Sequence, residues 1–153
     1  MTLNVNEPTD QRMVQELPSY IREGRVAVNA VSGSGNVGFT TLEVALGATS
    51  LSVGSEIGSY GLEFINCTGA GAAALATILG GSAGMVKVFI FGDALVGLVD
   101  GPKLTGQFYL DQLPALSTYT FDIDDVLAMI NIGGDGAAVY GYWKELYRTI
   151  SIR

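Results

Sequence analysis

The chain has 153 residues, enough for one domain and a short appendage. Charged side chains make up only 15% of it, against about 25% in a typical soluble domain, so we expect much of the surface to be covered by identical copies. The net charge of −7 argues against a nucleic-acid partner, which attracts a basic surface. With no histidine and one cysteine, zinc sites, histidine-based triads and an intrachain disulfide are excluded, and we predict a protein without a cofactor that is not an enzyme.

The first 32 residues differ in composition from the rest of the chain. Charged side chains are frequent up to Arg25, and prolines at positions 8 and 18 suit the first turn of a short helix. We therefore expect residues 1–32 to form an α-helical anchor and residues 33–38 to form a joint rich in glycine and serine. No window of about 18 residues is apolar enough for a membrane-spanning helix, so membrane insertion is not expected.

Beyond the joint, apolar residues alternate with polar ones at a period of two, as in β-strands. Strand patterns separated by turn signals recur every 8–12 residues or so, which is typical of a β-sandwich or barrel. We predict a mainly β domain over residues 39–153, an antiparallel sandwich or barrel-like knob. The expected strands fall near residues 42–46, 51–53, 62–64, 85–91, 95–99, 107–110, 119–121, 126–132 and 139–152.

The tract over residues 68–74 is rich in glycine and alanine and admits two interpretations, a close-packed helical turn or a glycine-rich loop. Gly33, Gly35 and Gly38 spell a formal G-x-G-x-x-G. A dinucleotide-binding motif needs a helix to open at its third glycine, whereas an alternating β-branched segment follows here. We favour a joint, and keep a nucleotide-binding enzyme as an alternative function.

Two further clusters have both a structural and a functional interpretation. Asp122, Asp124 and Asp125 could bind a cation, but no calcium-loop pattern follows them, so we favour a turn. The aromatic residues near the C-terminus could stack on sugars, as in a bacterial β-sandwich lectin, but a core or a subunit interface is favoured. Cys67 is most simply a small buried apolar residue.

Several segments together resemble bacteriophage fibre-knob, head-fibre and capsid-decoration proteins. The segment Ile78–Phe91 is similar to their "I-x-G-G-x-x-G, then strand" signature, and the strands Asp124–Ile130 and Trp143–Arg148 match two later motifs. The segment over residues 10–29 is similar to the virion-attachment segments of such proteins. The resemblance covers both ends and most of residues 75–153, and no repetitive shaft is present.

The resemblance implies a non-enzymatic virion structural protein, made in the host cytoplasm and assembled as a homotrimer. Its partners would be a major capsid, neck or tail protein, reached through the N-terminus, and a host-surface glycan or protein. The expected attachment residues are Leu17, Pro18, Tyr20, Ile21, Arg22, Arg25 and Asn29. The residues expected in the core or the oligomer interface are Met85, Val88, Phe91, Met129, Trp143 and Tyr147.

Overall fold

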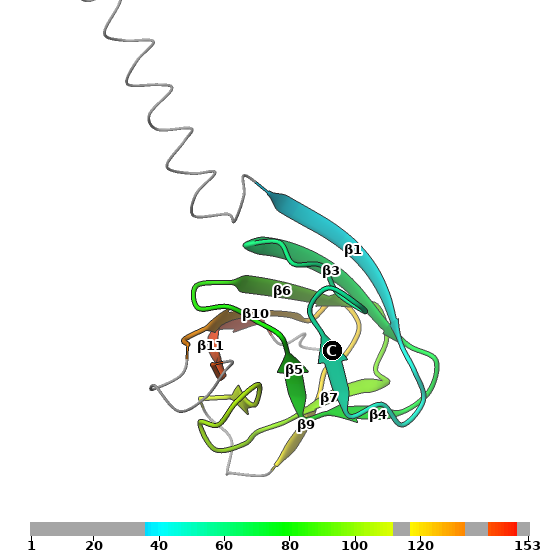
Figure 1. The fold of residues 1–153 in the computed structure, drawn as a ribbon. Helices are drawn as coiled ribbons and strands as arrows, with labels where there is room; N and C mark the ends of the chain where they lie inside the picture. Colours follow the sequence, from blue (N-terminus) through cyan, green and yellow to red (C-terminus); the bar gives the residue numbers. More distant parts are fainter. Residues whose placement is uncertain (1–35, 112–116, 134–140, 150–153) are drawn as a thin grey trace, which may run out of the picture. The chain divides into compact units, whose positions relative to one another are not determined.

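A computed structural model of the protein describes residues 36–111, 117–133 and 141–149. All regular elements in these ranges are β-strands, which confirms the mainly β class (Figure 1). The expected helical anchor over residues 1–32 lies outside the described residues. The strands are β1 (Val37–Val44), β2 (Ser50–Ser52), β3 (Leu62–Gly69), β4 (Ala73–Leu75), β5 (Thr77–Leu79), β6 (Val86–Phe91), β7 (Val96–Val99), β8 (Phe108–Tyr109), β9 (Thr118–Thr120), β10 (Val126–Asn131) and β11 (Trp143–Thr149).

The first half of the described region winds in coils of about 25 residues. Strands β1, β3 and β6 lie parallel and in register, so that Val37 pairs with Leu62 and Leu62 with Val86. The chain returns between them through short strands that also pair in parallel, β2 with β5 and β4 with β7. Parallel neighbours need a crossover of a dozen or more residues, usually a helix, and here strands and turns supply it.

The second half adds antiparallel pairing. Strand β10 runs antiparallel to β6 and β11 antiparallel to β10, which completes a six-stranded sheet in the order β1-β3-β6-β10-β11-β8. Strand β9 runs antiparallel to β7 in a second sheet. The expectation of an antiparallel sandwich is therefore wrong for the coiled half, because sequence alternation reports which face a residue occupies and not the direction of the neighbouring strand.

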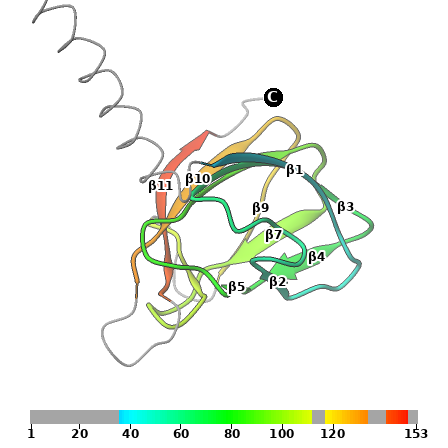
Figure 2. The same ribbon diagram turned by 45° about the horizontal axis from the view of Figure 1, so that its top comes forward.

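The hydrophobic core lies between the six-stranded sheet and the shorter strands β4, β5, β7 and β9, which form the opposite layer (Figures 1 and 2). Phe91 and Phe121 stack across it with ring centroids 4.3 Å apart. Cys67 is fully buried, and burial raises the pKa of its thiol to about 12. In the part of the chain that the structure describes, no helix is long and apolar enough to cross a membrane.

A charged pair sits in the interior of the six-stranded sheet. Glu63 on β3 and Lys87 on β6 are register partners, both side chains are 0% exposed, and Lys87 Nζ lies 2.6 Å from Glu63 Oε1. Lys87 also donates to the carbonyls of Gly58 and Tyr60, while Glu63 accepts from the Gly58 N–H and the Thr40 hydroxyl. Burial lowers the pKa of Lys87 and its bond to Glu63 opposes that shift, so this satisfied network supports a buried ion pair.

A β-bulge changes which residues of β11 face the core. Met129 pairs with Glu145 but its neighbour Ala128 pairs with Tyr147, so Leu146 is the extra residue. Trp143 and Glu145 point inward, whereas Tyr147 leaves that face and is 60% exposed. Strict alternation, which puts Trp143 and Tyr147 on one face, is therefore wrong beyond the bulge.

The tract rich in glycine and alanine is neither a helical turn nor only a loop. It contains the end of β3 and most of β4, and Gly69 and Gly71 allow the chain to turn tightly between these strands. A Cβ at Gly69 would lie 2.8 Å from both the Gly71 carbonyl and the Leu95 side chain. Strand β1 also begins at Val37, two residues before the expected start of the β-domain.

Candidate functional site

The outward side of the six-stranded sheet, which we call the outer face, consists of three rows that each cross five strands, β1, β3, β6, β10 and β11. The central row contains no charged residue. The rows are Val37-Leu62-Val86-Ile130-Lys144, Phe39-Phe64-Val88-Ala128-Tyr147 and Thr41-Asn66-Ile90-Val126-Thr149. An outward face of this composition differs from the polar outer side expected of a sheet that packs on a core and faces water.

In part of the sheet, charged side chains face the core and apolar side chains face outward, the reverse of the usual arrangement. One inward row holds Glu63, Lys87 and Glu145, whose side chains are buried, while the outward residues beside them are Leu62, Phe64, Val86 and Val88. Apolar side chains therefore point outward on the same strands whose charged side chains point into the core. Large apolar outward patches mark binding surfaces in soluble proteins.

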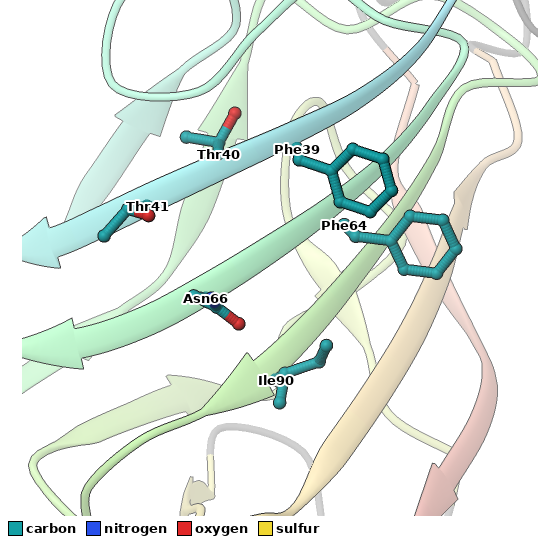
Figure 3. A pocket seen from close by; sticks show the side chains of 6 residues that line it. All are labelled: Phe39, Thr40, Thr41, Phe64, Asn66 and Ile90. Atoms are coloured by element: carbon teal, nitrogen blue, oxygen red, sulfur yellow. The ribbon is translucent and has the colours of Figure 1, made fainter.

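The outer face is most exposed at strand β1, the edge strand of the sheet. Phe39 is 79% exposed and Val37 is 46% exposed. The Phe39 ring stacks on that of Phe64 with centroids 5.4 Å apart, and the two rings lie side by side in Figure 3. Beside them is a shallow pocket of about 280 Å³ with both apolar and polar walls. It is lined by Phe39, Thr40, Thr41, Phe64, Asn66 and Ile90.

The far edge of the sheet has a different character. Lys103 lies 4.5 Å above the Tyr109 ring, and Lys144 forms an ion pair with Asp111 at 2.8 Å that raises the pKa of the lysine. Arg148 pairs with Glu145 at 2.6 Å, but this pair is largely buried, so the exposed charges of the edge are Lys144 and Asp111. Charged side chains along an exposed edge discourage strand pairing with another chain. Strand β1 has no comparable protection, because Glu43 is its only charged residue.

The acidic residues near the loops serve the backbone rather than a reaction centre. Asp100 accepts from the Leu110 N–H at 2.7 Å, Asp93 from the Gly69 N–H at 2.9 Å and Asp125 from the Asp122 N–H at 2.8 Å. Asp124 has a φ of 68°, so the aspartate cluster forms the turn that the sequence favoured. Within the described ranges, no three acidic or cysteine side chains gather closely enough to hold a metal ion.

The segments that carry the family resemblance meet inside the β-domain. The indole of Trp143 donates to the Ile78 carbonyl at 3.0 Å, and a Cβ at Gly81 would lie 2.6 Å from the same indole. The two residues joined by this hydrogen bond are 65 positions apart in the sequence. The motif glycine at position 81 therefore makes room for the motif tryptophan, which is a structural role.

The third glycine of the G-x-G-x-x-G lies in a strand. Gly38 is the second residue of β1, where a Cβ would overlap the Tyr60 ring, so glycine is needed here for packing. No helix opens at this position, as a dinucleotide-binding loop requires. The first two glycines of the motif are outside the described residues.

The expected core and interface residues separate into two groups. Phe91, Met129 and Trp143 are buried in the core, and Met85 packs against it. Val88 and Tyr147 lie on the outer face instead. All of the expected attachment residues fall outside the described part of the chain.

Sequence reasoning missed Phe39 and Phe64 as surface residues. Period-two alternation assigns Phe64 and Glu63 to opposite faces but cannot tell which face is inside, and the apolar residue is the natural choice for the core. One signal was available, because Lys87 interrupts the next apolar strand and offers a partner for Glu63. The roughly 25-residue spacing of the coils was also missed.

Comparisons of the chain with protein-family models, with curated proteins and with solved structures find no match.

Proposed function

We propose that this protein is a non-enzymatic structural protein of a bacteriophage particle, a short homotrimeric fibre or a decoration or appendage protein. The observation that carries the proposal is the apolar outer face, which gives a rigid β-domain a surface suited to assembly. The resemblance of its motifs to virion appendage proteins supplies the particle as the setting. The ion pairs and loop contacts of the acidic residues support a structural role over an enzymatic one.

In this proposal the chain has two ends with different tasks. The first 32 residues dock on a capsid, neck or tail protein, and the β-domain projects outward, where it contacts the host surface. Several copies on one particle would make weak contacts with the host effective, because linked binding sites act at high local concentration.

The direct test is to look for the chain in purified particles of the phage that encodes it, by mass spectrometry and by antibody labelling in electron microscopy. We expect a fixed number of copies per particle. A full-length variant with Arg22→Glu and Arg25→Glu should fold and keep its oligomeric mass but fail to join particles. If purified particles lack the protein, the proposal is wrong; if the variant still joins them, attachment lies elsewhere in the chain.

A nucleotide-binding enzyme remains the competing function to test, although the strand that follows Gly38 gives it no support. Thermal melting with and without NAD or ATP separates the two, because a ligand that binds the folded state raises the melting temperature by mass action. We expect no shift with either nucleotide.

A further inference from the structure

We infer that the outer face of the six-stranded sheet is the surface between copies of this chain, and that its central row is the centre of the contact. The inference rests on the proposed homo-oligomeric function and adds the surface and its residues. Across the row run Phe39, Phe64, Val88, Ala128 and Tyr147 on five neighbouring strands.

The size of the outer face suits a subunit contact. Five strands spaced about 4.8 Å apart and three rows of outward residues at about 6.8 Å per row span roughly 24 Å by 20 Å. That is about 500 Å² on each copy and about 1,500 Å² on the three copies of a trimer, above the roughly 1,000 Å² at which an interface is expected to be specific. The stacked Phe39 and Phe64 rings beside the shallow pocket provide the aromatic anchor that such interfaces usually contain.

The charge distribution favours a second copy over an unlike partner. Each copy carries a net charge of −7, so two copies repel each other unless they approach through a surface without carboxylates. The three rows of the outer face contain no acidic residue, and Glu43 and Lys144 lie at the margins. Three such faces can meet around a threefold axis without desolvating a carboxylate.

The first 35 residues are a less suitable cover. They carry seven charged side chains by Arg25, whereas the central row offers no charged group to pair with them. Burying unpaired charges against Phe39, Val88 and Ala128 would be unfavourable. A cover by this segment would also differ measurably from a cover by a second copy, because it would not depend on protein concentration.

The test compares two substitutions that make the same chemical change in different places. Phe39→Glu puts a carboxylate on the outer face, and Leu104→Glu puts one at a residue between β7 and β8 that is 59% exposed and belongs to none of the three rows. Because Phe39 is 79% exposed within one copy, its replacement should leave the fold intact. Circular dichroism of both variants checks this.

Sedimentation or light scattering then gives the mass from submicromolar to tens of micromolar protein. We expect wild type and Leu104→Glu at about 48 kDa, three copies of the 16.0 kDa chain. We expect Phe39→Glu to raise the dissociation constant at least about 30-fold, the factor of a hot-spot residue. Val88→Glu should act in the same way. If both variants keep the wild-type mass, the outer face is not the subunit contact.

A measurement on wild type alone avoids any doubt about folding. Hydroxyl-radical labelling of Phe39 should fall as the protein concentration rises through the dissociation constant. Labelling that is low at every concentration, with a 16.0 kDa species throughout, would overturn the inference, since the face would then be covered within one copy. The two proposals fail separately. A trimer that dissociates in Phe39→Glu but is absent from phage particles refutes only the proposed function, and a particle protein unaffected by Phe39→Glu refutes only the contact.

Discussion

Replacing Trp143 with alanine should destabilise the β-domain more than any other single truncation we consider. Trp143 is the largest fully buried side chain among the described residues. Removing a buried tryptophan costs about 3–5 kcal/mol, through lost burial and the cavity that remains. The Ile78 carbonyl also loses the indole N–H as its donor, and an unsatisfied buried acceptor costs about 1–3 kcal/mol.

Because the two costs overlap, we expect a total loss of about 4–6 kcal/mol, a large share of the 5–15 kcal/mol that stabilises a typical domain. Trp143→Phe keeps a ring in the core and loses the hydrogen bond, so it should cost roughly half as much. The matched control is Leu146→Ala on the same strand, which is the extra residue of the bulge and is 55% exposed. We expect Leu146→Ala to change stability by no more than about 0.5 kcal/mol.

The assay is urea unfolding followed by far-ultraviolet circular dichroism, because removing the only tryptophan also removes its fluorescence. All variants are compared at one protein concentration, since dissociation of an oligomer contributes to the apparent stability. A Trp143→Ala protein within about 1 kcal/mol of wild type would refute the assignment of this residue to the core. Equal losses for the alanine and phenylalanine variants would instead show that the hydrogen bond, not the packing, dominates.

Three further predictions concern the interior of the β-domain. Lys87→Met should cost about 3–5 kcal/mol in urea unfolding because it leaves Glu63 buried without its cation, and the double variant with Glu63→Gln should recover part of that loss. Gly38→Ala should lower the melting temperature by several degrees, since a Cβ would overlap the Tyr60 ring; an unchanged melting temperature would contradict the packing role. Cys67 should resist thiol reagents at pH 8 in the folded protein and react after unfolding. Because the pKa of Cys67 is raised to about 12, its titration should leave the free energy of unfolding unchanged below about pH 9 and lower it by about 1.4 kcal/mol per pH unit above that. Cys67→Ala should lack this slope.

The strand positions could be read from the sequence because most strands carry their own local signal. The expected strands overlap β1, β2, β3, β6, β7, β8, β9, β10 and β11, although β1 begins at Val37 rather than at residue 42 and β3 extends to Gly69 rather than to residue 64. Strand β4 was missed because alanine is not a typical strand residue, and strand β5 because its three residues are too few to show an alternation of polarity. These short strands depend on their parallel neighbours β7 and β2, which lie more than twenty residues away in the sequence.

The candidate site was the harder part to predict. The sequence shows that Leu62 and Phe64 share one face and Glu63 the other, but not which face is covered. Lys87 decides which face is covered, because it is the register partner of Glu63 and supplies the cation that stabilises a buried carboxylate. The outer face follows from that pairing, because Phe39, Phe64 and Val88 are then left outside.

The sequence by itself determined the mainly β class, the absence of histidine chemistry and the period-two pattern of each strand, since composition and local alternation are properties of the chain. Only the tertiary structure decided that β1, β3 and β6 run parallel, that a bulge turns Tyr147 away from the core and that Glu63 and Lys87 lie inside. Strand direction, register and the choice of the covered face depend on contacts between residues far apart in the chain. Those contacts are fixed by packing and by the pairing of buried charges, which no local pattern records.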